Sequence, residues 1–171
     1  MYTVLVALGG NLGDRLAAMQ RALDAAAREI VWSHVSSIYE TDPMYRTDQP
    51  AFLNAAAMGT THLPALDCLR FLKSIEQELG REDGPRNGPR VIDLDLIDHS
   101  ERETRAPEMV LPHPRAHERR FVLAPLAEFA EDWVIGGAPI AAWLAQTESQ
   151  SDAVRKLAHA VLSLPSPRPE R

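Results

Sequence analysis

The stretch VIDLDLI, residues 91–97, shows most directly how this chain folds. Its apolar residues alternate with Asp93 and Asp95, and a period of two is typical of a β-strand whose successive side chains point to opposite faces of a sheet. Leu94 and Leu96 can then pack on a core while both carboxylates share the other face. We therefore predict a strand over residues 91–97 that presents two acidic side chains on one side.

The segments upstream of this strand complete an ordered set of elements. Val- and Leu-rich runs predict strands, and apolar residues at three- and four-residue intervals predict helices. In chain order, the expected elements are a strand over 3–8, a helix over 16–30, strands over 35–40 and 52–60, a helix over 64–79 and the strand over 91–97. This order is that of an α+β, ferredoxin-like βαββαβ sandwich, in which an antiparallel sheet carries both helices on one face.

The remaining residues predict short helical additions and a tail. A charged loop is expected over 98–107, and short helices are expected over 121–130 and 140–145. We assign residues 1–147 to a single domain. The segment 148–171 is polar and ends in a Pro-rich run, so we expect a flexible C-terminal tail there.

The composition fits one globular domain. A chain of 171 residues with 45% apolar content can bury one core but not comfortably two. The formal net charge of -6 argues against a protein that binds a nucleic-acid backbone, since such domains usually carry a basic surplus. Any phosphate site must therefore be locally basic, and arginines are frequent between Arg81 and Arg120.

The cysteine content and the apolar runs predict the compartment. The single cysteine, Cys68, excludes an intrachain disulfide framework and fits a reducing environment, where we expect a buried, inert thiol. No apolar run approaches the roughly 18 residues that span a bilayer, and the N-terminus lacks the basic region of a secretory signal. We therefore expect a cytoplasmic protein without membrane contact.

The two aspartates are candidate metal ligands. Residues two apart on a strand lie roughly 6 to 7 Å apart at Cα, so their carboxylates can jointly hold hard cations. Magnesium suits them best, because it prefers oxygen ligands and commonly binds through one or two carboxylates together with substrate phosphates. The alternative is a solvent-exposed polar strand edge, although aspartate is depleted in strands and like charges on one face repel.

Basic residues flank the acidic strand. Arg90 immediately precedes it, and Arg81 and Arg86 lie upstream; a guanidinium group binds phosphate well because it can donate two parallel hydrogen bonds. Downstream, His113 lies between two prolines in LPHP, residues 111–114, and proline favours extended backbone in the residue before it. A lone histidine is most often structural, so His113 by itself does not indicate chemistry.

Four motifs occur here in one order: GGNLGD at 9–14, QPAFLN at 49–54, GPR at 88–90 with DLD at 93–95, and LPHP at 111–114. Together they resemble the 6-hydroxymethyl-7,8-dihydropterin pyrophosphokinase family of folate biosynthesis. That family has the ferredoxin-like fold, and its members transfer the β,γ-diphosphate of ATP to the pterin hydroxymethyl group and release AMP. The resemblance implies the same reaction here, with ATP as co-substrate. We expect a monomer whose partners are small molecules.

The resemblance also implies roles for individual residues. Asp93 and Asp95 would bind two magnesium ions that bridge the ATP phosphates and the attacking hydroxyl, so that positioning and charge neutralisation supply most of the catalysis. Arg90 and His113 would act beside them as catalytic residues. The positions that match ATP-binding residues of the family are Glu76, Arg81, Arg90, His113 and Arg119.

The resemblance places a flat slot for the pterin between aromatic residues. Phe52 and Phe121 would form its walls, because such rings stack well on aromatic faces. The amide of Asn54 would bind the pterin edge, since it offers both a donor and an acceptor. From their own pattern alone, both phenylalanines would be interpreted as core residues. The other implied contacts come from the backbone around three residues: Thr41, Asp42 and Met44.

The loop over residues 82–87 departs from the family pattern. In the family this loop closes over both substrates, and many members carry a Trp directly before Gly-Pro-Arg and a second Arg early in the loop. This chain has Asn87 and Asp83 instead, and Pro114 replaces a tyrosine found beside the histidine in some members. These differences bear on lid closure and nucleotide affinity more than on chemistry at the aspartates.

Two other classes of function are considered. A non-catalytic, ferredoxin-like module could bind a nucleotide or metal for regulation without turnover, and the altered loop 82–87 would suit it. A nucleic-acid binder that uses exposed sheet aromatics is disfavoured by the net charge of -6 and by the acidic pair. The stretch GGNLG, residues 9–13, lacks the Lys-Ser or Lys-Thr of a P-loop, so we interpret it as a strand-to-helix turn.

Overall fold

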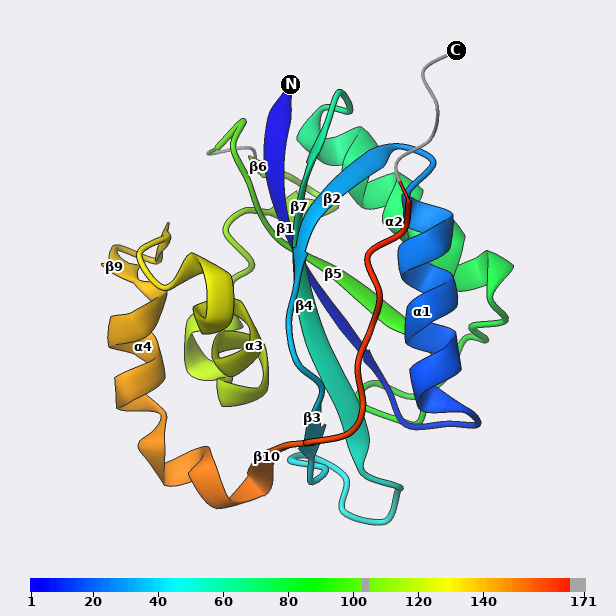
Figure 1. Cartoon of the computed structure of the whole chain (residues 1–171), viewed down its shortest axis with the longest axis vertical. Helices are drawn as coiled ribbons and strands as arrows, with labels where there is room; N and C mark the ends of the chain where they lie inside the picture. Colours follow the sequence, from blue (N-terminus) through cyan, green and yellow to red (C-terminus); the bar gives the residue numbers. More distant parts are fainter. Residues whose placement is uncertain (103–104, 167–171) are drawn as a thin grey trace.

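The computed structural model, which describes residues 1–102 and 105–166, is built around a six-stranded antiparallel sheet (Figure 1). The strands follow the order β10-β3-β4-β1-β5, and β2 also pairs with β4. This arrangement, with β1 and β4 at the centre, is the predicted ferredoxin-like fold. The strands are β1 (Tyr2–Gly10), β2 (Ile30–Val35), β3 (Tyr39–Thr41), β4 (Phe52–Thr61), β5 (Asp93–His99) and β10 (Val154–Lys156).

Helices cover both faces of this sheet. Figure 1 shows α1 and α2 on one side and α3 and α4 on the other. Along β1, Val4, Val6 and Leu8 pack toward the first pair of helices, while Leu5 and Ala7 pack toward the second pair. The face opposite the two predicted helices is therefore a second core. The helices are α1 (Arg15–Ala26), α2 (Ala65–Glu78), α3 (Arg120–Ala130) and α4 (Ile140–Gln146).

The ends of α1 and α2 are fixed by side chains and by a glycine. Asp14 caps α1, because its carboxylate accepts a hydrogen bond of 3.1 Å from the backbone N–H of Ala17. The first N–H of α2, at Ala65, donates to the carboxylate of Glu101 at 2.6 Å. Gly80 follows α2 with a φ of +91°, a conformation that glycine adopts easily at a helix end. The structure confirms that a helix exists in each predicted segment, and it confirms the bounds of α2 to within one residue.

The predicted strand over 35–40 and the predicted helix end at Ile30 are wrong. α1 stops at Ala26, and Ile30 is the first residue of β2. The strand breaks after Val35 because the hydroxyl of Ser36 accepts a hydrogen bond from the N–H of Ala56 at 2.9 Å, which replaces a regular ladder contact. Pairing with β4 resumes at β3, so two short strands stand where one was expected.

The C-terminal half contains the two expected short helices, α3 and α4, and β5 begins and ends two residues later than expected. Asp98 was assigned to a charged loop, but it is buried within β5. Its carboxylate accepts hydrogen bonds from the N–H of His99 at 2.9 Å and from the indole of Trp133 at 2.7 Å. The small elements are β6 (Arg105–Ala106), β7 (Met109–Val110), β8 (Val134–Ile135), β9 (Ala138–Pro139) and the 3-10 helices Ala116–Glu118 and Glu148–Ala153.

Residues 148–166 lie against the domain. After β10, the N–H of Leu157 donates to the carbonyl of Ile38 at 2.8 Å, and Leu162 is buried against the core beside α1. This packing differs from the flexible tail expected there, because a polar average composition hides apolar residues that reach buried positions. The rest of that segment lies outside the described residues. Within the described part of the chain, no helix has the length and apolar character needed to cross a bilayer.

Candidate active site

A cavity lies on the face of the sheet that α3 covers, next to the loops over 42–51 and 82–92. β1, β4 and β5 contribute to its floor, and the residues that precede and begin α3 form one wall. It contains every residue with an implied pterin role: Thr41, Asp42, Met44, Phe52, Asn54 and Phe121. It also contains four residues with implied phosphate or metal roles: Arg90, Asp93, Asp95 and Arg119.

Asn54 provides a fixed polar group in this cavity. Its side chain is buried with the residue only 7% exposed, and its Nδ2 donates to the hydroxyl of Thr41 at 2.7 Å. The adjacent position on β1 is Gly9, where a Cβ atom would lie 2.9 Å from the Oδ1 of Asn54. The glycine is therefore required for close approach of the amide to β1, and this explains the first residue of the motif GGNLGD.

The aromatic wall includes cationic partners. Phe52 and Phe121 are half-buried, as expected for side chains that can receive a flat ring. The guanidinium of Arg119 lies 5.7 Å from the ring of Phe121 and 5.8 Å from the ring of Tyr45, within range of cation–π attraction. Arg115 also contacts Tyr45, donating to its hydroxyl at 2.7 Å. Sequence reasoning missed Tyr45, because nothing in its pattern marks it.

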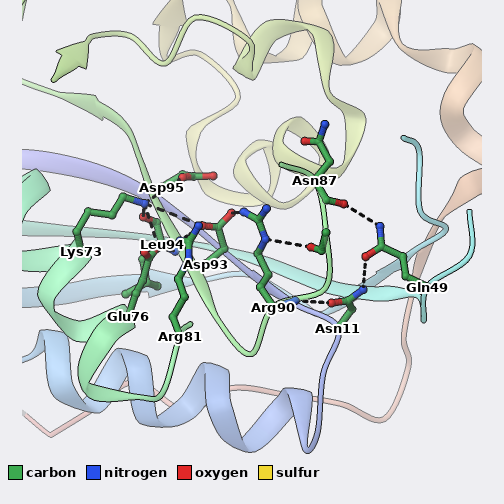
Figure 2. Close-up of polar contacts among 11 residues, drawn as sticks. Asn11, Gln49, Lys73, Glu76, Arg81, Asn87, Arg90, Asp93, Leu94 and Asp95 are labelled. Atoms are coloured by element: carbon green, nitrogen blue, oxygen red, sulfur yellow. Dashed lines mark hydrogen bonds and ion pairs between the residues drawn. The ribbon is translucent and has the colours of Figure 1, made fainter. Parts of the chain in front are cut away.

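Asp93 and Asp95 lie on the expected face of β5, opposite Leu94 and Leu96. Figure 2 shows Asp93 between two arginines. Arg81 donates to its Oδ1 at 2.8 Å, and Arg90 donates to its Oδ2 at 3.1 Å. The side chains of Asp93 and Asp95 are 23% and 30% exposed, respectively, so both carboxylates stay accessible from the cavity.

Two residues of α2 complete this cluster by reaching around the edge of the sheet. Within residues 1–102 and 105–166, β5 is the last strand of the sheet, so no described strand lies on the outer side of Leu94. Glu76 accepts a hydrogen bond from the Leu94 N–H at 2.6 Å, and Lys73 donates to the Leu94 carbonyl at 2.8 Å. The two side chains thus satisfy backbone groups that an edge strand leaves unpaired.

Lys73 is the main residue of this cluster that the sequence prediction missed. Its Nζ lies 2.9 Å from the Oε1 of Glu76, 3.5 Å from the Oδ1 of Asp95 and 4.0 Å from the Oδ1 of Asp93. The spacing of Lys73 and Glu76, three positions apart on one helix, is a signal that could have paired them. This spacing could not have shown that the two side chains lie beside Asp93 and Asp95.

The surrounding charges set the protonation of this cluster. Burial raises the pKa of Asp93, but Lys73, Arg90 and Arg81 outweigh burial and hold that pKa below its ordinary value. Burial, together with the charge of Asp93, raises the pKa of Asp95. Burial lowers the pKa of Lys73, but the nearby carboxylates, led by Asp95, raise it overall. Asp93 is therefore firmly ionised, whereas Asp95 lies in a more anionic environment that a further cation would relieve.

Asn11 and Gln49 join the loops beside the cavity. The Nδ2 of Asn11 donates to the side chain of Gln49 at 3.1 Å and to the carbonyl of Pro50 at 3.0 Å, while its Oδ1 accepts from the N–H of Arg90 at 2.9 Å. Gln49 in turn donates to the carbonyl of Asn87 at 2.9 Å, as Figure 2 shows. Both residues belong to motifs that the sequence marked, but their role in tying three loops together was not foreseen.

Only some of the residues with implied ATP contacts line the first cavity. Glu76 and Arg81 line a second, more polar cavity with Lys73, Gln77 and Asp83. Lys73 contacts both Asp93 and Asp95, and Arg81 contacts Asp93, so these residues connect the second cavity to the first one.

His113 is not part of the lining of either cavity. The backbone N–H of His113 donates to the carbonyl of Ile97 at 2.7 Å. The ring Nδ1 of His113 accepts a hydrogen bond from the backbone N–H of Arg115. Burial lowers its pKa, while the charge of Asp95 opposes that shift. The imidazole is therefore held beside β5 by backbone contacts and lies within electrostatic range of the aspartates.

The donor set fits magnesium. Asp93 and Asp95 are the carboxylates that could hold it; among the residues that the structure describes, no three His, Cys, Asp or Glu side chains form a metal cluster. Magnesium typically takes one or two carboxylates and completes its shell with water and substrate phosphates. Asp93 and Asp95 face a cavity that can admit such phosphates.

Comparison with known proteins gives consistent matches. A family model described as 7,8-dihydro-6-hydroxymethylpterin-pyrophosphokinase matches residues 5–131. A Bacillus subtilis protein named 2-amino-4-hydroxy-6-hydroxymethyldihydropteridine pyrophosphokinase is 41% identical over 128 residues, which cover 74% of this chain and 77% of the relative. A protein of the same name from Methylorubrum extorquens is 41% identical over 150 residues, which cover 86% of this chain and 95% of the relative.

Longer proteins are similar over part of their length. The mitochondrial folate synthesis bifunctional protein of Arabidopsis thaliana is 43% identical over 128 residues, which cover 74% of this chain and 23% of that protein. This chain thus spans about a quarter of the plant relatives that it matches.

The solved structures support the fold. One is a structure described as HPPK-DHPS in complex with substrates, where HPPK abbreviates the pyrophosphokinase family named above. It matches with a TM-score of 0.73 at 12% identity, and the match covers 91% of this chain and 46% of that chain. Plasmodium falciparum HPPK-DHPS with pterin and p-hydroxybenzoate has a TM-score of 0.70 at 11% identity, with coverages of 91% and 45%. At such low identity these matches show the shared ferredoxin-like fold.

Proposed function

Because the chain belongs to the 7,8-dihydro-6-hydroxymethylpterin-pyrophosphokinase family, we propose that it is the enzyme that makes dihydropterin diphosphate for folate biosynthesis. It transfers the β,γ-diphosphate of ATP to the hydroxymethyl group of 6-hydroxymethyl-7,8-dihydropterin. The hydroxymethyl oxygen loses its proton to water and bonds to the β-phosphorus, the bond from that phosphorus to the α,β-bridging oxygen breaks, and AMP leaves. The products are AMP and the pterin diphosphate ester.

One observation carries this proposal. All six residues with implied pterin contacts line one cavity together with Asp93 and Asp95. A flat heterocycle held against Asn54 and the phenylalanines would lie beside the carboxylates. Positioning two reactants in this way is a large part of catalysis in phosphoryl transfer.

The pterin would be bound by a combination of stacking and edge contacts. Phe52 and Phe121 supply the aromatic faces, and Asn54 supplies a donor and an acceptor from a side chain that Thr41 holds at 2.7 Å. A preorganised amide loses little conformational entropy when it binds a ligand, which favours specific recognition of the heterocycle edge.

Asp93 and Asp95 would hold two magnesium ions, and magnesium would supply charge neutralisation across the phosphates and the attacking hydroxyl. Arg81 and Arg90 contact Asp93, and their remaining N–H groups would be donors for the triphosphate. Arg119, which lines the same cavity, would contact the phosphates from the α3 side, and His113 would act on them from beside β5.

The test is incubation of the purified chain with ATP, magnesium and 6-hydroxymethyl-7,8-dihydropterin. AMP and the diphosphate ester are expected in equal amounts by liquid chromatography. Chelation of the metal with EDTA is expected to stop turnover, and restored magnesium is expected to recover it.

The same assay separates the alternatives. Formation of ADP instead of AMP would show that the diphosphate-transfer assignment is wrong. ATP binding without consumption of either substrate would favour the non-catalytic nucleotide-binding module.

We also propose that the chain acts as a cytoplasmic monomer. The single cysteine and the apolar patterns of the sequence support this location. Sedimentation of the purified chain as a species of about twice its 18.9 kDa mass would contradict the monomer.

A further inference from the structure

Lys73 lies where a metal ion bound by the aspartates would have to compete with it. Its Nζ is 3.5 Å from the Oδ1 of Asp95. A magnesium ion binds carboxylate oxygen at about 2.0–2.1 Å, so an ion on that oxygen would lie within about 6 Å of the ammonium group. Two cations at such a separation in a partly buried site repel each other substantially.

The ion pairs around the aspartates are unequally distributed. Asp93 pairs with Arg81, Arg90 and Lys73, whereas among the described residues Asp95 pairs with Lys73 alone. Removal of the lysine charge therefore changes Asp95 far more than Asp93. The arginines stay in place to neutralise Asp93.

Lys73 is also anchored by one neutral contact and one further ion pair. It donates to the carbonyl of Leu94 at 2.8 Å and to Glu76 at 2.9 Å. Its side chain is 40% exposed and borders the second cavity. A flexible four-carbon stem can swing the ammonium away from Asp95 into that cavity without moving α2.

From these contacts we propose that Lys73 is a positioning residue that competes with the divalent cation for Asp95. It holds Asp95 and Glu76 in place through its ammonium group, and it sets the metal concentration at which the aspartate pair is occupied. This proposal rests on the proposed function only through the assignment of Asp93 and Asp95 as metal ligands.

The test measures metal binding directly, with Mn²⁺ as the probe and without nucleotide. Free Mn²⁺ is followed by electron paramagnetic resonance during titration of the full chain. Lys73→Gln keeps a donor for the Leu94 carbonyl but removes the charge, so it is expected to bind Mn²⁺ about ten-fold more tightly than the unsubstituted chain. Lys73→Arg keeps the charge and is expected to bind as the unsubstituted chain does.

Arg70→Gln is the matched control. Arg70 lies one helical turn before Lys73 on α2 and pairs with Glu108 on the surface at 2.8 Å. It carries the same charge but does not contact the aspartates, so its removal is expected to leave Mn²⁺ affinity unchanged. An equal gain in Arg70→Gln would reduce the effect to net charge and overturn the proposal.

Thermal unfolding provides a second measurement. Mn²⁺ is expected to raise the unfolding temperature of Lys73→Gln more than that of the unsubstituted chain, because binding to the folded state stabilises it. Unchanged or weaker Mn²⁺ affinity in Lys73→Gln overturns the proposal, as does absence of binding in every variant at millimolar metal.

The two hypotheses fail separately. Tighter Mn²⁺ binding by Lys73→Gln without any pterin diphosphate formation would retain the role of Lys73 and reject the proposed reaction. Product formation by the unsubstituted chain with unchanged Mn²⁺ affinity in Lys73→Gln would do the reverse.

Discussion

Single residues of this site are constrained by short approaches between β1 and its neighbours. A Cβ atom at Gly9 would lie 2.9 Å from Asn54 Oδ1, and one at Gly10 would lie 2.4 Å from the carbonyl oxygen of Val91. The first of these neighbours is the tip of a side chain that can shift, and the second is backbone that cannot shift easily. Substitution of Gly9 therefore tests binding, whereas substitution of Gly10 tests folding.

Gly9→Ala is expected to raise the KM for the pterin by about ten-fold, because displaced Asn54 loses roughly one good hydrogen bond to the substrate. Steady-state kinetics at saturating ATP would measure it. Gly13→Ala is the control: Gly13 has a φ of +65° and no atom within 4 Å of its Cβ position, so it should cost about 1 kcal/mol of stability without changing KM. Equal KM changes in both variants would contradict the role of Gly9.

Asp95→Ala is expected to lower kcat by a factor of about 1,000 or more while preserving the fold, because a metal ligand is removed from a phosphoryl-transfer site. Its unfolding temperature should not fall, since burial and Asp93 already disfavour the charged carboxylate. Product formation and circular dichroism would measure the two effects. Asp67→Ala is the control, because Asp67 is an exposed residue of α2, and it is expected to leave kcat unchanged. Near-normal turnover in Asp95→Ala would reject the assignment of Asp95 as a metal ligand.

For single residues, the sequence predicts those site positions that belong to a periodic or local pattern. Asp93 and Asp95 follow from a two-residue alternation within one strand. Lys73 does not, because its contact with Asp95 depends on where α2 lies along the edge of β5. The bond from Arg90 to Asn11 joins residues 79 positions apart, and no local pattern records such a pair.

Among the elements, the loops beside the cavity depend on one side chain. Asn11 makes three side-chain hydrogen bonds, to Gln49, Pro50 and Arg90, and thereby connects the turn after β1 to two other loops. The loop over residues 82–87 is linked to this set through Asn87. The loops are therefore positioned together rather than separately.

Asn11→Ala is expected to destabilise the fold by about 1–3 kcal/mol, because it leaves partly buried polar groups without partners. It should also raise the KM for both substrates, since it frees loops on both sides of the cavity. Urea unfolding and steady-state kinetics would measure these effects. Gln20→Ala is the control: it removes exposed contacts to Asp24 and Ser163 and is expected to leave both KM values unchanged. If Asn11→Ala shifted the KM of only one substrate, the idea that the loops are positioned together would be contradicted.

The elements were predicted well where apolar periodicity is long and poorly where a side chain interrupts it. Both helices of the ferredoxin-like core and the strands β1, β4 and β5 follow from such patterns. The break at Ser36 depends on a hydroxyl that bonds to β4, which propensity cannot reveal. β10 was missed because three residues with one buried side chain carry almost no periodic signal.

For the whole molecule, His99 links stability to pH. It is fully buried at the end of β5, where its Nε2 contacts the Leu63 carbonyl at 3.1 Å and its Nδ1 accepts from the N–H of Glu101 at 3.1 Å. Both contacts together require a neutral ring with its proton on Nε2. Burial lowers its pKa below the ordinary value, so the unfolded chain binds a proton more readily than the folded chain.

The free energy of unfolding is therefore expected to be constant above about pH 6.5 and to fall as pH drops through the lowered pKa of His99, by at most about 1.4 kcal/mol per pH unit. Urea unfolding between about pH 5 and pH 8 would measure this slope. In His99→Gln, which keeps a donor for the Leu63 carbonyl, the slope should flatten. His62→Gln changes an exposed histidine and should retain the slope of the unfolding free energy against pH. An unchanged slope in His99→Gln would show that His99 is not the titrating group.

The pairing of β3 with β10 has a consequence for how the protein matures. Asp42, in the wall of the cavity, is held by Arg155, 113 positions later in the chain. During synthesis the ribosome releases the helices and central strands long before this partner, and contacts of such long range form slowly because closing the intervening loop costs entropy. A nascent chain can thus acquire its core while its substrate rim is incomplete, so ligand binding would distinguish finished molecules from unfinished ones.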